Sequence, residues 1–117
     1  MSKHNETGVK GEQIAEKFLQ EKGYVILHRN WCAGKKEIDI IAQKADILVF
    51  VEVKTRSSIQ FAYPEESVDF QKQGYLRSAA EAFLDSNPEH IKVQFDIVSI
   101  HLNGENIKEI MHFEDAF

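Results

Sequence analysis

The sequence lacks several features that would assign it to a specialised class of protein. It has one cysteine, Cys32, so it cannot form an internal disulfide, and it lacks the paired Cys and His spacings of a structural zinc site. No hydrophobic run approaches the length of a membrane span, and no apolar segment follows a positively charged start. These absences exclude a disulfide scaffold and a zinc finger, and they lead us to expect a cytoplasmic protein with no membrane partner.

Positive charge is also scarce, which at first argues against a nucleic-acid partner. The formal net charge is −5, from 19 Asp and Glu against 14 Lys and Arg. Residues 1–56 carry ten basic and eight acidic side chains, whereas residues 57–117 carry four and eleven. The first half is therefore mildly basic, and a cation held there would make its local field more positive.

Length and hydrophobic patterning predict one small α/β domain. A chain of 117 residues, 43% of them hydrophobic, can bury one core but is too short for two. We therefore expect a single domain over residues 1–117, with a flexible N-terminus at 1–7. Apolar residues at helical spacing predict a helix over 7–22, and a second helix is expected from an N-cap at Asp69 to Asn87.

Runs of β-branched and aromatic residues mark the expected strands. They predict strands over 24–31, 37–42, 47–55 and 91–102 and a short one near 107–112, with turns at 32–36 and 43–46 and a loop over 57–66. The order is α-β-β-β-α followed by one or two strands, which favours a mixed central sheet flanked by helices. The third strand is apolar on both faces until Glu52, as expected for a strand in the middle of a sheet.

The hairpin at the centre of this order carries the residues best suited to chemistry. Glu52 and Lys54 are two apart in one strand and therefore project from the same face. A hairpin in which residue 42 pairs with 47 places Asp39 diagonal to Glu52, close enough for two carboxylates to share a cation. Carboxylates suit Mg²⁺, and together with a lysine they meet the needs of phosphodiester hydrolysis. The alternative is that Glu52 and Lys54 form an ordinary exposed pair at the end of a strand.

Several motifs, taken in order and spacing, resemble the UPF0102 family, also called YraN-like proteins. They are Gly11-Glu12, Arg29-Asn30-Trp31, the Glu-Ile-Asp-Ile-Ile-Ala segment at 37–42, the Val-Phe-Val-Glu-Val-Lys-Thr-Arg segment at 49–56, Lys72, and Phe-Asp-Ile-Val at 95–98. That family is similar to the archaeal Holliday junction resolvases. The resemblance therefore implies the restriction-endonuclease-like fold and a nuclease ancestry.

The resemblance also implies roles for individual residues. It makes Asp39, Glu52 and Lys54 the metal-binding and catalytic core of a site of the PD-(D/E)-x-K type. Glu12 would be a further carboxylate that reaches this core from the first helix. The three carboxylates would then hold Mg²⁺ or Mn²⁺.

Other polar residues have both a functional and a plain surface interpretation. Lys72 and Arg56 resemble contacts to DNA phosphate, but a solvated lysine and a surface ion-pair partner suit them as well. Taken without the resemblance, Glu12 is better interpreted as a solvated glutamate on the helix surface. The five histidines have no metal-ligand spacing, so they are interpreted as surface or strand-end residues. Gly74 and Tyr75 stand where the family often has basic residues, which predicts weaker DNA binding.

Two functions are compatible with these observations. The first is a Mg²⁺- or Mn²⁺-dependent endonuclease acting on DNA, with branched or structured DNA and a homodimer suggested by the similarity to resolvases. The second is a non-catalytic module that keeps the fold in order to bind nucleic acid or a repair protein. A binding module has no need to keep Asp39, Glu52 and Lys54 together, so the intact set favours the enzyme.

Overall fold

The order of helices and strands predicted from the sequence is confirmed. The computed structural model describes residues 6–56, 68–89 and 92–117. Its elements are α1 (Glu6–Glu21), β1 (Val25–Ala33), β2 (Lys36–Lys44), β3 (Ile47–Arg56), α2 (Phe70–Ser86), β4 (Lys92–Asn103) and β5 (Asn106–Phe113). The expected loop at 57–66 lies outside the described residues, as does the expected N-terminal segment 1–7 except for the start of α1. The fifth strand, which the sequence left open, is present.

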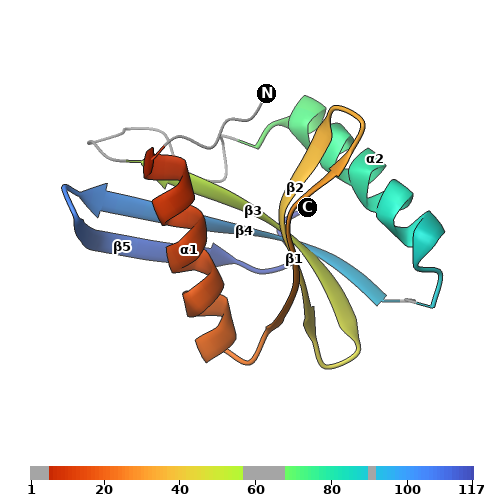
Figure 1. Cartoon of the computed structure of the whole chain (residues 1–117), viewed down its shortest axis with the longest axis horizontal. Helices are drawn as coiled ribbons and strands as arrows, with labels where there is room; N and C mark the ends of the chain where they lie inside the picture. Colours follow the sequence, from red (N-terminus) through yellow and green to blue (C-terminus); the bar gives the residue numbers. More distant parts are fainter. Residues whose placement is uncertain (1–5, 57–67, 90–91) are drawn as a thin grey trace.

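The strands form one mixed sheet in the order β1-β2-β3-β4-β5. β3 and β4 are parallel, and every other neighbouring pair is antiparallel. A parallel pair needs a connection that returns to the same end of the sheet, and α2 lies within that connection. Figure 1 shows the strands running together through the middle of the molecule, with α1 and α2 well separated from each other. β3 is therefore the central strand, as its unbroken apolar sequence predicted.

Alternating residues of the central strand pack against different helices. Val49, Val51 and Val53 share a core with Ala15 and Leu19 of α1. Leu48 and Phe50 instead belong to a core with Ala79, Ala80 and Phe83 of α2. Because side chains alternate between the faces of a strand, α1 covers one face of the sheet and α2 the other. Glu52 and Lys54 follow Phe50 by two and four residues, which places them on the α2 face.

The predicted register of the central hairpin is wrong by two residues. Ala42 pairs with Val49 rather than with residue 47, and the ladder continues to Lys44 and Ile47. The turn is therefore shorter than expected, with Ala45 in the left-handed region at a φ of 54°. A shift by an even number of residues leaves the paired side chains on their predicted faces. The ladder ends at Ile40 and Val51, one residue short of Asp39 and Glu52, so Asp39 has no ladder partner on β3.

The turn between β1 and β2 is also shorter than the predicted segment 32–36. Ala33 pairs with Lys36, so only Gly34 and Lys35 lie between the strands. Gly34 has a φ of 64°, a conformation that glycine adopts without a steric penalty. β1 consequently extends two residues further than predicted.

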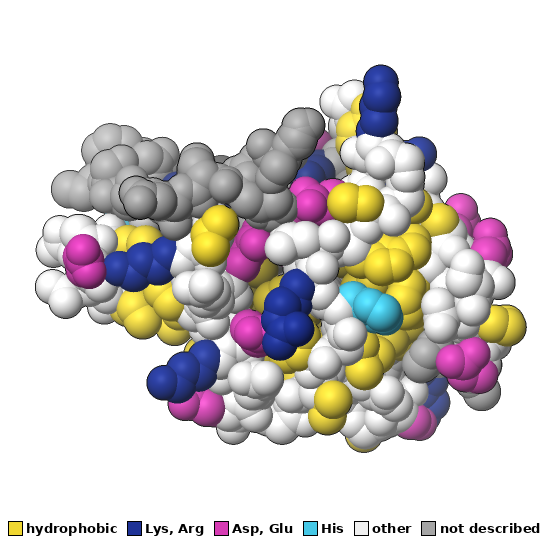
Figure 2. Space-filling view, viewed as in Figure 1, with side chains coloured by type: hydrophobic (Ala, Val, Ile, Leu, Met, Phe, Trp, Pro, Cys, Tyr) yellow, Lys and Arg dark blue, Asp and Glu magenta, His cyan; other side chains and the backbone are white. Residues whose placement is uncertain are grey.

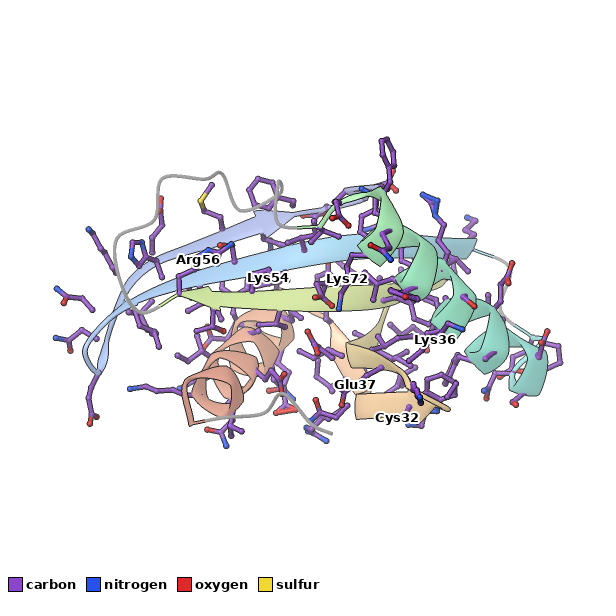
Figure 3. The ribbon with its side chains drawn as sticks, turned by 90° about the horizontal axis from the view of Figure 1, so that it is seen from above. Cys32, Lys36, Glu37, Lys54, Arg56 and Lys72 are labelled. Atoms are coloured by element: carbon purple, nitrogen blue, oxygen red, sulfur yellow. The ribbon has the colours of Figure 1, made fainter. Side chains whose placement is uncertain are left out.

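Two surface properties bear on the interpretation of the site. None of the helices within the described ranges is both long and apolar enough to cross a bilayer. On the face of the molecule shown in Figure 2, Lys and Arg side chains are scattered among Asp and Glu and form no continuous basic surface. The side of the molecule that Figure 3 presents contains Lys54, Arg56 and Lys72.

Candidate active site

The candidate site forms where β2 and β3 separate. Their ladder ends at the pair Ile40 and Val51, one residue before Asp39 and Glu52 would face each other. Beyond that point the Asp39 carboxylate takes the place of a backbone carbonyl of the neighbouring strand. Its Oδ2 accepts a hydrogen bond of 2.9 Å from the backbone N–H of Val53. The hydrogen bond joins Asp39 to β3 next to Glu52 and satisfies a backbone donor that the β2/β3 ladder leaves unpaired.

Glu52 is a buried carboxylate in the central strand. Only 5% of its surface is exposed, and its neighbours Val51 and Val53 are also buried. This burial excludes the alternative that Glu52 and Lys54 are an ordinary exposed pair at a strand end. A buried carboxylate is retained only with compensating positive charge or hydrogen bonds, so its partners define what the site can do.

Two lysines supply that positive charge. Lys54, two residues along β3, places its Nζ 3.6 Å from Glu52 Oε2, as expected for neighbours on one face of a strand. Lys72, in the first turn of α2, places its Nζ 3.5 Å from the same oxygen. Figure 3 shows Lys54 on β3 and Lys72 at the start of α2. The sequence suggested either a phosphate contact or a solvated lysine for Lys72 and did not reveal its contact with Glu52, because the two residues are distant in the chain.

Glu12 approaches the site from α1. The helix comes unusually close to β3 at Gly11, where an added Cβ would overlap the side chain of Thr55. The next residue, Glu12, is half-buried, and its charge raises the pKa of Asp39. Glu12 therefore acts electrostatically on Asp39.

The electrostatics of Asp39 show a shortage of positive charge. Burial is the main cause that raises its pKa, to about 8, and the charges of Glu52 and Glu12 add to the effect. The hydrogen bond from Val53 and the charge of Lys72 act in the opposite direction but do not offset the rise. Desolvation and neighbouring like charges are the usual causes of such a shift, and a bound cation would reverse it.

The remaining predicted phosphate contact, Arg56, lies two residues beyond Lys54 at the end of β3. The alternation of the strand gives both side chains the same face of the sheet. Figure 3 shows Arg56, Lys54 and Lys72 succeeding one another along β3 toward α2. The structure thus brings the predicted cationic residues to the same side of the sheet as Glu52.

The donor set fits a hard divalent cation. Asp39 and Glu52 offer carboxylate oxygens, and Mg²⁺ is commonly held by one or two carboxylates with water and phosphate oxygens completing its shell. Among residues 6–56, 68–89 and 92–117, however, no three His, Cys, Asp or Glu side chains form a group arranged to hold a metal. Glu12 therefore does not complete a preformed set of three ligands with Asp39 and Glu52.

A second polar cluster, which the sequence analysis did not predict, lies on the α1 face around Asp96. This aspartate is fully buried, and its carboxylate accepts hydrogen bonds from Tyr24, His112, Gln94 and the backbone of Asp115. Burial alone would raise the pKa of Asp96, but these hydrogen bonds bring it below its ordinary value. His112 lies at the end of β5, as one of its two predicted interpretations has it, but it is not a surface residue, because its side chain is 3% exposed against Asp96.

Asp96 could have been recognised from the sequence. It interrupts the apolar run Phe95-Asp96-Ile97-Val98 in a predicted strand, where a carboxylate needs buried partners. The cluster links Tyr24, which lies between α1 and β1, with β4, β5 and the C-terminal residues. Lys22 contacts His112 at its edge and pairs with Glu114 rather than with Asp96. Its chemistry therefore suits structural support.

Comparison with known proteins places the chain among uncharacterised relatives. The profile of the uncharacterised protein family UPF0102 matches residues 11–100. A UPF0102 protein of Flavobacterium psychrophilum is 48% identical over 117 residues, which cover 100% of this chain and 98% of the relative. A UPF0102 protein of Bacteroides thetaiotaomicron is 44% identical over 117 residues, with coverage of 100% and 96%.

Among solved structures, SfsA of Pyrococcus furiosus in complex with Ca²⁺ aligns with 92% of this chain and 62% of its own. The TM-score is 0.37 and the sequence identity is 13%. The family profile and the nearly full-length relatives agree with the motifs found in the sequence. The chain therefore belongs to the UPF0102 family.

Proposed function

We propose that this protein is a divalent-metal-dependent endonuclease that hydrolyses phosphodiester bonds of DNA. The observation that carries the proposal is the buried Glu52, flanked by two lysines, with Asp39 hydrogen-bonded to the next residue, Val53, where the β2/β3 ladder ends. A purely structural carboxylate at this place would need one cationic partner. The surplus of both carboxylates and lysines suits a site that binds a cation and an anionic substrate together.

The residues divide the work of hydrolysis among them. In the reaction, the oxygen of a water molecule bonds to phosphorus while the bond to the leaving sugar oxygen breaks, and that oxygen takes up a proton. When bound, Mg²⁺ or Mn²⁺ would stabilise negative charge on the phosphoryl and leaving oxygens. Asp39 and Glu52 would hold the cation, and Glu12 would orient water in its shell. Lys54 would orient the attacking water and offset phosphate charge.

The substrate class follows from charge and from the family resemblance. Lys54, Lys72 and Arg56 offer a cationic side to a phosphate backbone, although the chain as a whole is acidic. The resemblance to junction resolvases favours branched or structured DNA over plain duplex. Because one site cuts one strand, cleavage of both strands calls for a homodimer, whose mass in solution can be measured by light scattering.

Cleavage assays with Glu52→Gln test the proposal. Purified protein is incubated with duplex, single-stranded, flap and four-way-junction DNA, with and without Mn²⁺. Wild-type protein should cleave one of these substrates, and Glu52→Gln should lower the rate by orders of magnitude, because the charge that holds the cation is lost. Binding of the same DNA in metal-free buffer should stay the same or increase, since a repulsive charge is removed.

The exposed Glu81 provides a matched control. Glu81→Gln removes the same charge from the surface of α2 and should leave the cleavage rate unchanged. Undiminished Mn²⁺-dependent cleavage by Glu52→Gln would show that the activity lies elsewhere or comes from a contaminant. Binding of DNA without cleavage of any substrate would instead favour the non-catalytic module.

A further inference from the structure

The contact of two lysines with one oxygen of Glu52 is the starting point. The Nζ atoms of Lys54 and Lys72 lie 3.6 Å and 3.5 Å from Glu52 Oε2. One ammonium group comes from β3 and the other from α2. One lysine is enough to neutralise one carboxylate. The second ammonium therefore adds positive charge at a place where a cation bound to Glu52 would also have to lie.

The backbone around Lys72 is held in place by hydrogen bonds at the start of α2. Its backbone N–H donates a hydrogen bond of 2.9 Å to the N-cap residue Asp69. The preceding Val68 is buried, and its carbonyl accepts a hydrogen bond of 3.1 Å from the side chain of Gln73. The start of α2 is thus anchored on both sides of Lys72, whereas the Lys72 side chain is 28% exposed. Its ammonium group can change partner without any movement of the helix.

Lys72 also acts on the second carboxylate of the site. Its ammonium lies 3.5 Å from Glu52, and Asp39 is hydrogen-bonded to Val53, the residue that follows Glu52. A cation shared by Asp39 and Glu52 would occupy the same region. Two positive groups so close together repel each other strongly in a partly buried site.

We propose that Lys72 holds the place of the cation at Glu52 in the metal-free protein and moves to a DNA phosphate when a divalent cation binds. The inference rests on the proposed function, because it requires Glu52 to be a cation ligand. Lys72 is then a positioning residue whose single ammonium couples the two binding events. The cation releases the ammonium, and the released ammonium strengthens the binding of DNA.

Metal binding to the DNA-free protein tests this exchange without any cleavage. Mn²⁺ is titrated into wild-type protein and into Lys72→Met, which keeps the length of the side chain and removes its charge, and heat is recorded by calorimetry. Loss of a competing positive charge should tighten Mn²⁺ binding about tenfold in Lys72→Met. Lys72→Arg keeps the charge and should bind Mn²⁺ within about twofold of wild type, on the same reasoning.

The exposed Lys108 on β5 controls for the change in net charge. Lys108→Met should bind Mn²⁺ as wild type does, because its side chain projects from an edge strand remote from the site. Circular dichroism of each variant establishes that the fold is intact. Equal or weaker Mn²⁺ binding by folded Lys72→Met, or tighter binding by Lys72→Arg as well, would overturn the inference.

DNA binding provides the second half of the test. The affinity for four-way-junction DNA is measured by fluorescence anisotropy with and without Ca²⁺, and gels verify that the DNA stays intact. The gain in affinity that Ca²⁺ gives the wild-type protein should be reduced severalfold in Lys72→Met. An equal gain in both proteins would overturn the coupling. Cleavage that is abolished in Glu52→Gln while Mn²⁺ affinity is unchanged in Lys72→Met would reject the exchange and leave the proposed nuclease function standing.

Discussion

Asp39 and Asp96 are two desolvated aspartates of the same sheet, and the fold surrounds them with opposite electrostatic environments. Asp96 receives four hydrogen bonds, and these bring its pKa below the ordinary value in spite of complete burial. Asp39 accepts a hydrogen bond from Val53 and lies near two other carboxylates, and its pKa rises to about 8. The first arrangement stabilises the charged form within the protein itself. The second leaves the charged form in need of a cation from outside.

This difference separates a stabilising carboxylate from one suited to binding. A group whose donors all come from the chain contributes to folding and has little capacity left for a ligand. A group held in place but short of positive charge costs stability in the metal-free protein, a cost that functional sites commonly carry. The contrast can be tested by neutralising each aspartate in turn.

The largest effect on stability is expected from Asp96→Asn. The amide cannot accept all four hydrogen bonds and leaves buried donors of Tyr24 and His112 without a charged acceptor, so the free energy of unfolding should fall by about 3 kcal/mol. Because the folded pKa of Asp96 is lowered, the wild-type protein should also lose this stabilisation as the pH falls through that pKa. Urea denaturation at several pH values measures both effects.

The exposed Asp85 in the last turn of α2 is the matched control. Asp85→Asn should change the free energy of unfolding by less than about 0.5 kcal/mol. Folded Asp96→Asn should still bind Mn²⁺ as wild type does. An Asp96→Asn protein of wild-type stability would show that the hydrogen-bonded cluster contributes nothing to the fold.

Asp39→Asn should have a smaller effect of the opposite sign. A folded pKa raised from 3.8 to about 8 means that wild-type stability is present at low pH and is lost as the pH rises through this range. The amide oxygen can still accept the hydrogen bond from Val53, so the metal-free variant should gain about 2 kcal/mol at pH 8, with screening by solvent and the lysines limiting the gain.

Thermal unfolding in chelator, followed from pH 4 to pH 8, provides the measurement. The wild-type curve should approach that of Asp39→Asn at low pH and diverge from it at high pH. Saturating Mn²⁺ should restore the stability of wild type but not affect the variant. A variant less stable than wild type at pH 8 in chelator would mean that Asp39 is already well neutralised.

The smallest effect is expected from Asp69→Ala, which acts on the site through α2. Loss of the N-cap hydrogen bond to Lys72 should lower the free energy of unfolding by about 1 kcal/mol. Because the same bond fixes the backbone of Lys72, the variant should also bind Mn²⁺ slightly more tightly. Asp85→Ala, at the other end of the helix, serves as the control in urea denaturation and calorimetry and should alter neither quantity.

Local patterns were enough to predict the elements of the fold. The apolar stripe of α1, the N-cap at Asp69 and the β-branched runs all gave the correct element type, and the sheet has the expected mixed character. The register of the central hairpin was not predictable, because its turn places Ala45 at a positive φ. Alanine carries no signal for that conformation, which glycine or asparagine would have indicated. The predicted face of Glu52 and Lys54 was unaffected, because the register shift was an even number of residues.

Only the part of the candidate site that lies on β3 and its hairpin partner β2 could be predicted from the sequence. The spacing of Glu52 and Lys54 fixed their common face, and the hairpin brought Asp39 close. The second ammonium at Glu52 and the partners of Asp96 other than Gln94 come from residues distant in the chain, which no local spacing reveals. Burial of Glu52, the observation that decides its interpretation, likewise depends on how α2 packs over the sheet.

The close approach of Gly11 to Thr55 sets a rule for sequence variation in this family. Any side chain at position 11 would collide with Thr55, whose own Cβ would lie 2.8 Å from the added Cβ, so α1 could keep its distance from β3 only if position 55 lost its side chain as well. Positions 11 and 55 should therefore vary as a pair. A relative that enlarges one without reducing the other must lift the first turns of α1, and Glu12, next to Gly11, would move away from Asp39 with them.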